Sequence, residues 1–123
     1  MALDSSAWTL ESIGGTDVTL DVPPTLAFRT GGTFTGFAGC NDFFGDRVEI
    51  GDGTIKVEQL GATARGCDDP AAEPVEIAYL DALQHMSGWT LAGDTLTLTG
   101  TTELAFSRRQ GTPASPSDPG TYR

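Results

Sequence analysis

Short runs rich in Thr, Val, Ile, Leu, Phe and Trp recur along this chain, and Gly, Asp and Pro separate them. β-branched and aromatic residues favour strands and the separating residues favour turns, so the pattern is typical of a meandering antiparallel sheet or barrel. In residues 95–99 leucine alternates with threonine, so Leu96 and Leu98 should face the core. The Gly-Asp-Gly string at 51–53 and the Gly-Asp pair at 93–94 can take the positive φ angles of tight hairpins. We expect strands at 7–13, 16–20, 25–29, 33–38, 47–50, 54–59, 88–92, 94–99 and 102–107.

One stretch, residues 72–86, departs from this pattern because it is rich in Glu, Ala, Leu and Gln. It predicts a helix, with Pro74 tolerated in the first turn. Ile77 and Leu80 fall outside the apolar stripe of this helix, and we expect a neighbouring loop to cover them, the alternative being an exposed apolar spot. The inward face is expected to consist of Val75, Ala78, Tyr79, Ala82, Leu83 and Met86. The predicted fold is therefore mainly β: a single antiparallel sheet or barrel with one α-helix packed on it.

The length of 123 residues suits one domain with one core. We assign residues 1–108 to that domain. Residues 109–123 contain three prolines and no apolar periodicity, and they are expected to form a disordered tail. No apolar run of about 18 residues predicts a transmembrane segment. The first residues lack the basic start and apolar stretch of a signal peptide, so they predict no compartment.

The charge of the chain is strongly negative, with 17 acidic against 7 basic residues and a formal net charge of -10. Such a charge repels phosphate backbones and anionic headgroups, which disfavours nucleic acids and membrane surfaces as partners. The excess of carboxylates either keeps the protein in solution or attracts a basic partner.

Four strings of distinctive residues follow one another in a fixed order. They are Gly39-Cys40-Asn41 within the glycine-rich stretch 36–45, the string from Thr63 to Cys67, Tyr79-Leu80-x-x-Leu83 in the helix, and Trp89-x-Leu91-x-Gly93-Asp94-x-Leu96-x-Leu98 near the end. The ordered set resembles the META/HslJ domain family over residues 8–108. The resemblance implies a small β-rich domain with one helix and no established enzyme activity. It also implies a place in the bacterial cell envelope, commonly as a lipoprotein, and an association with stress responses such as heat shock. This chain differs from many relatives in lacking a lipoprotein signal.

Cys40 and Cys67 admit three explanations. In an oxidising compartment they would form a disulfide, which stabilises a domain by roughly 3 to 4 kcal/mol when it closes a loop of this length. In the cytosol they would be two reduced, buried thiols that behave as small hydrophobes. Reactive or metal-bound cysteines are the third explanation, although zinc sites need more ligands than two cysteines and one histidine supply. We predict the disulfide and keep the other two as alternatives.

Gly39, Cys40, Asn41 and Thr63 are interpreted as a structural motif rather than a ligand site. Glycine permits positive φ, and an asparagine amide can satisfy backbone groups where a strand ends. A further hypothesis follows from the disulfide, because it would bring two oxygen-rich strings together. The candidate cation cluster, of a kind that could attract Ca²⁺, consists of Asn41, Asp42, Asp68 and Asp69.

No pattern in the chain predicts catalysis, a cofactor or a dedicated metal site. The single histidine, His85, is expected on the helix surface, and the chain has neither a nucleophile elbow nor a phosphate-binding loop. We therefore predict a monomeric, non-enzymatic domain of the cell envelope or extracellular space, with the cytoplasm as the alternative location. It would bind an unknown protein or envelope component, or give structural support. The alternative is a β domain that holds a small apolar ligand in a cavity lined by Phe34, Phe37, Phe43, Phe44 or Trp89.

Overall fold

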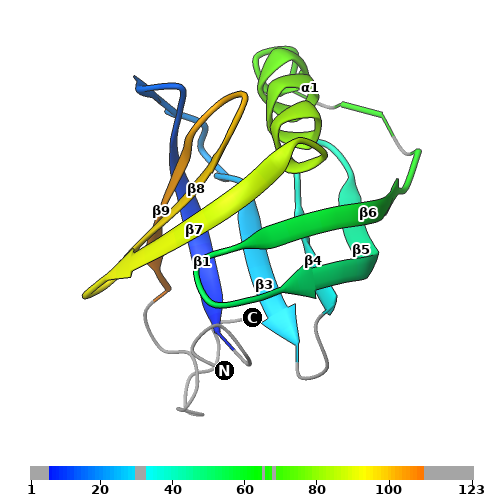
Figure 1. Cartoon of the computed structure of the whole chain (residues 1–123). Helices are drawn as coiled ribbons and strands as arrows, with labels where there is room; N and C mark the ends of the chain where they lie inside the picture. Colours follow the sequence, from blue (N-terminus) through cyan, green and yellow to red (C-terminus); the bar gives the residue numbers. More distant parts are fainter. Residues whose placement is uncertain (1–5, 30–32, 65, 68, 110–123) are drawn as a thin grey trace, which may run out of the picture.

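The computed structural model describes residues 6–29, 33–64, 66–67 and 69–109, apart from the side chains of 46–48. One antiparallel sheet and one helix make up this part of the chain (Figure 1). The elements are β1 (Ala7–Ile13), β2 (Thr16–Asp17), β3 (Thr25–Arg29), β4 (Thr33–Phe37), β5 (Asp42–Ile50), β6 (Ile55–Ala62), α1 (Ala72–Leu83), β7 (Met86–Ala92), β8 (Thr95–Gly100) and β9 (Leu104–Arg108). The predicted mainly β class with one helix is confirmed.

The strand order is β6-β5-β4-β3-β1-β9-β8-β7, and β2 pairs only with β1. The sheet curls until its two edge strands, β6 and β7, approach each other. At this seam Thr54 forms an isolated bridge with Gly88, and the Trp89 amide donates to the Gly53 carbonyl at 3.1 Å. The result is a half-barrel, and α1 lies across one end of it while β1 begins and β9 ends at the other (Figure 1).

The core fills the concave side of the sheet. Inward positions alternate along the strands, and Leu96 and Leu98 of β8 are fully buried as their period of two predicts. A row of aromatic rings in mostly edge-to-face contact crosses this core. The rings are those of Phe28, Phe34, Phe43, Tyr79 and Phe106.

Tyr79 carries the packing from the helix into the sheet. Its side chain is completely buried, and its hydroxyl donates to the Thr25 carbonyl at 2.9 Å. Burial raises the pKa of this hydroxyl well above its ordinary value, so it stays a neutral donor. The hydrogen bond fixes α1 against the start of β3.

The helix differs from its prediction in length and in rotation. It ends at Leu83, and the predicted inward residue Met86 is buried as the first residue of β7 instead. Ala78, expected to face inward, is exposed, and Val75 is only half-buried. The fully buried helix residues are Ala72, Tyr79, Ala82 and Leu83. The inward stripe is therefore rotated toward Ala72 relative to the predicted one.

The expectation that a loop covers Ile77 and Leu80 is wrong for the first residue. Ile77 is 63% exposed, whereas Leu80 is half-buried and packs against the core. The rotation of the helix explains the burial of Leu80, because it turns position 80 toward the sheet, whereas position 77 faces away from the sheet in both orientations.

Three strands differ by three or more residues from a predicted bound, and one of them is β6, which ends at Ala62 rather than 59. β5 begins at Asp42 rather than 47, because Phe43 and Phe44 pair with β4. Register shifts around residues 45–48 then interrupt the alternation that would have revealed one long strand. β2 ends at Asp17 rather than 20, and the chain beyond it runs beside α1. The predicted tail from 110 onward lies outside the described residues.

Candidate functional site

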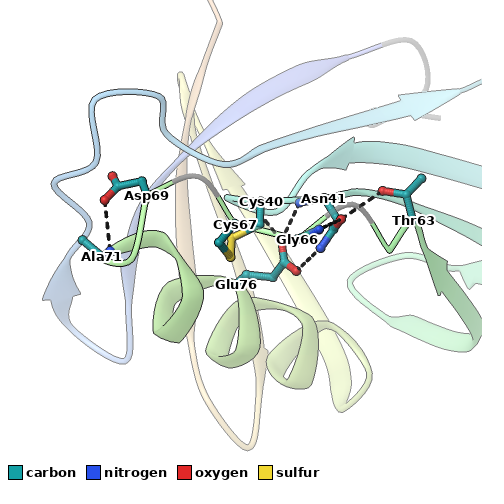
Figure 2. Close-up of a disulfide and its surroundings, with 8 residues drawn as sticks. All are labelled: Cys40, Asn41, Thr63, Gly66, Cys67, Asp69, Ala71 and Glu76. Atoms are coloured by element: carbon teal, nitrogen blue, oxygen red, sulfur yellow. Dashed lines mark hydrogen bonds between the residues drawn. A yellow bond between two sulfur atoms is a disulfide. The ribbon is translucent and has the colours of Figure 1, made fainter.

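A disulfide between Cys40 and Cys67 ties the loop after β4 to the segment that leads into α1 (Figure 2). The two Cα atoms lie 4.6 Å apart, although 27 positions separate them in sequence. Each cysteine lies in a loop rather than in a strand, so the sheet ladder alone would not hold these segments together. The covalent bond fixes where the chain leaves the sheet and enters the helix.

Glu76 of α1 is hydrogen-bonded to the same loop. Its Oε1 accepts hydrogen bonds from the backbone amides of Cys40, at 2.8 Å, and Asn41, at 2.7 Å. Its Oε2 accepts one from the Asn41 side-chain amide, also at 2.7 Å. Burial alone would raise the pKa of this carboxyl, but the three hydrogen bonds outweigh it and lower the pKa below the ordinary value of 4.5. Glu76 is therefore ionised at neutral pH and acts as a charged acceptor for the turn.

Asn41 connects the helix to the end of β6. It is one of the few buried polar residues, at 8% exposure. Its side-chain amide donates to Glu76, while its Oδ1 accepts from the Gly66 amide at 3.2 Å and from the Thr63 hydroxyl at 3.4 Å. Both ends of the side chain are thus used, which suits a buried amide.

Thr63 completes the link just after the end of β6, opposite the first residue of β5. Its backbone amide donates to the Asp42 carbonyl at 2.9 Å, and its Oγ1 accepts from the Asp42 amide at 3.1 Å. We call the set of Cys40, Asn41, Thr63, Cys67 and Glu76 the polar hub. It joins two loops and the helix at one point (Figure 2).

Gly39 is the position at which this hub requires glycine. Its φ is 124°, a conformation that residues with a Cβ rarely adopt. A Cβ there would also lie 3.3 Å from the Ala72 carbonyl oxygen at the start of α1. The structure thus brings Gly39, Cys40, Asn41 and Thr63 together in the arrangement expected of a structural motif.

Sequence reasoning missed Glu76, which makes three of the hydrogen bonds in the hub. A signal for it was present, because Glu76 shares a helical stripe with the buried residues Ala72, Tyr79 and Leu83. A single carboxylate among inward positions needs a fixed partner, and here that partner is the Gly-Cys-Asn turn.

The candidate cation cluster is only partly within the described residues. The oxygen of the Asn41 amide already accepts two hydrogen bonds, and Asp69 Oδ1 accepts one from the Ala71 amide at 3.0 Å. Among the residues that the structure describes, no group of three or more His, Cys, Asp or Glu side chains could hold a metal ion. Asp68 lies outside them, so the four-residue cluster stays a prediction.

The five aromatic residues considered for a ligand cavity do not converge on one space. Phe34 and Phe43 are core residues in edge-to-face contact, and the Phe44 ring lies over Gly61 on the other face of the sheet with 40% exposure. The Trp89 indole donates to the Gly51 carbonyl at 2.9 Å. Phe37 lines a surface hollow together with Leu20 and Val22.

His85 lies on the exposed surface just beyond the end of α1. Its Nδ1 is 2.8 Å from the Asp81 carbonyl oxygen, one helical turn earlier.

The helix α1 has 12 residues, far fewer than the ~20 that cross a bilayer. No helix within the described ranges could span a membrane.

Comparisons with known proteins give a consistent result. The chain is similar to a protein from Burkholderia xenovorans whose structure was solved by NMR, with 28% identity, a TM-score of 0.70, and coverage of 89% of this chain and 85% of that one. A second NMR structure matches with 25% identity, a TM-score of 0.70, and coverage of 86% and 91%. A crystal structure of a DUF4847 family protein from Bacteroides vulgatus shares only the fold, with 14% identity, a TM-score of 0.58, and coverage of 85% and 93%. A search of the curated proteins found no match. The model of the META domain matches residues 1–111, so the chain belongs to the META domain family.

Proposed function

We propose that this META domain works in the cell envelope or extracellular space, without catalysis, by binding a protein or envelope component. The observation that carries the proposal is the Cys40–Cys67 disulfide and its place in the polar hub. Disulfides persist in oxidising compartments and are rare in the cytosol. A domain with a disulfide at the junction of its sheet and its helix is therefore suited to an oxidising compartment.

The chemistry of the hub supports a structural rather than a catalytic role. A general base needs an accessible lone pair and a pKa near the working pH. Glu76 instead has a lowered pKa and is engaged by three donors. The cysteines are joined, so neither is a thiolate nucleophile. The expected association with stress responses rests on the resemblance to the META/HslJ family.

The redox state of the cysteines in the native host tests this proposal. Protein taken directly from the host would be denatured without reductant, alkylated, and weighed by mass spectrometry. We expect no alkylated thiol in the wild-type chain. The Cys40→Ser variant is the matched control, because it leaves Cys67 as a single thiol that the reagent must detect. Two alkylated thiols in the wild type would contradict the extracytoplasmic placement.

A further inference from the structure

An apolar groove runs between α1 and the segment that follows β1. It has a volume of about 360 Å³. One wall is formed by residues of the 13–20 segment and the other by one side of the helix. The apolar residues along it are Ile13, Val18, Leu20, Ala71, Pro74, Val75 and Ala78. Because Ala71, Pro74 and Ala78 are exposed and the other four are half-buried, the groove presents apolar surface to the solvent.

The apolar surface continues beyond the groove on the side of residues 13–22. A second hollow, of about 410 Å³, begins at Leu20 and includes Val22 and Phe37. Val22 is 64% exposed and Ile77, next to Ala78 on the helix, is 63% exposed. Among the described residues, these are two of the three large hydrophobic side chains that are exposed. The groove and the hollow that adjoins it at Leu20, with the exposed Val22, mark a candidate interaction surface.

Within the described part of the chain, the charged residues that line the groove and the second hollow are all acidic. The sequence contains no Lys or Arg at 13–28 or at 66–107, which include both walls of the groove. Asp17 lines the groove, Asp21 and Asp69 line the second hollow, and all three are exposed. Arg29 and Arg108 are the last residues of β3 and β9, and these two strands finish at the end of the half-barrel away from α1 (Figure 1).

We propose that this groove, defined by residues 13–22 and 71–78, binds a cationic amphipathic helix of a partner protein. The inference rests on the proposed binding function and names its site and the chemistry of its partner. The apolar face of such a helix would enter the groove, and its Lys and Arg side chains would meet the carboxylates at the rim. A second copy of this chain is a poor occupant, because its own net charge is -10.

A synthetic peptide provides the probe. It has about 15 residues, long enough to form a helix on binding, with Leu on one face and Lys on the other. Backbone amide shifts of the isotope-labelled full chain would be followed during titration. We expect shifts confined to residues 13–22 and 71–78. A peptide with Glu in place of each Lys, and one with the same composition but no apolar face, should each bind at least tenfold more weakly. Equal binding of either control peptide, or shifts centred elsewhere, would overturn the proposal.

A pair of matched variants tests the site itself. Ala78→Lys places a cation at the groove and should weaken binding of the Leu/Lys peptide by about tenfold or more, through lost apolar contact and charge repulsion. Ala92→Lys makes the same change at an exposed position at the far end of β7 and should leave the affinity within about twofold. Neither position is buried, so both variants should keep the melting temperature of the wild type. An equal loss in both variants, or no loss in Ala78→Lys, would contradict the assignment of the groove. Such a result would not alter the alkylation test of the compartment.

Discussion

The sheet is fastened at two places by different means. At the polar hub a disulfide and a carboxylate with three hydrogen bonds hold the loops to the helix. At the seam between β6 and β7 the fastening consists of one bridge, one amide hydrogen bond and the Trp89 indole. The hub ties α1, which belongs to no strand ladder, to the loops beside the end of the β5–β6 ladder, whereas the seam joins strands that already have a ladder on their other side. The covalent bond thus lies where no ladder holds the helix to the sheet.

Removal of the disulfide should have the largest effect. The double variant Cys40→Ser/Cys67→Ser should lose roughly 3 to 4 kcal/mol of unfolding free energy, because the unfolded chain regains the freedom of a long loop. Urea unfolding measures this loss. The wild-type protein in reductant is the control and should lose a similar amount. A loss below about 1 kcal/mol in both would show that the hub does not depend on its covalent bond.

Neutralisation of Glu76 should rank second. Glu76→Gln replaces a charged acceptor, and hydrogen bonds to charged groups are worth about 1.5 to 3 kcal/mol. We expect a loss of about 2 kcal/mol in urea unfolding. The matched control is Glu73→Gln, an exposed residue in the same helix, which should cost no more than about 0.5 kcal/mol. Equal effects would assign the loss to helix charge rather than to the hub.

The same carboxyl predicts a pH dependence. Its pKa is lowered in the folded state, so its contribution is fully present above the ordinary value of 4.5 and is lost as the pH falls through the lower, folded value. The difference in stability between wild type and Glu76→Gln should thus be constant near neutral pH and shrink in acid. A difference that grows below pH 4.5 would mean that the sign of the shift is wrong.

Weakening of the seam should have the smallest effect. Trp89→Phe removes the indole hydrogen bond to the Gly51 carbonyl but keeps an aromatic ring, and should cost about 1 kcal/mol. Amide hydrogen exchange would localise the change. We expect the backbone amide at position 89 to exchange faster in the variant, with no change for the Cys40 and Asn41 amides of the hub. A change at the hub would show that the two fastenings are coupled.

Much of the fold could be predicted from local patterns, because those patterns are set by neighbours in sequence. The alternation around Leu96 and Leu98 reports burial directly. The exact rotation of α1 could not be predicted in this way. It depends on the contact of Glu76 with Asn41, 35 positions away, which no helical wheel contains. The start of β5 was hidden for a related reason, since bulges near 45–48 break the alternation that marks a strand.

The candidate site was predicted in part. The residues of Gly39-Cys40-Asn41 and Thr63 carry recognisable turn chemistry, and the structure places them together. The groove beside α1 was not foreseen, because Val18 and Leu20 were assigned to a strand and Ala78 to the core. An apolar residue gives the same sequence pattern whether it faces a core or an open groove. Only the rotation of the helix distinguishes a core position from a groove position.

The central position of β1 has a consequence for synthesis of the chain on the ribosome. β1 lies between β3 and β9, so one of its edges stays unpaired until residues 104–108 have emerged. The Trp8 side chain, fully buried in the finished domain, has its β9 neighbour supplied last. Truncated products that end before β9 would therefore expose the middle of the sheet rather than its margin, which makes them substrates for chaperones and proteases.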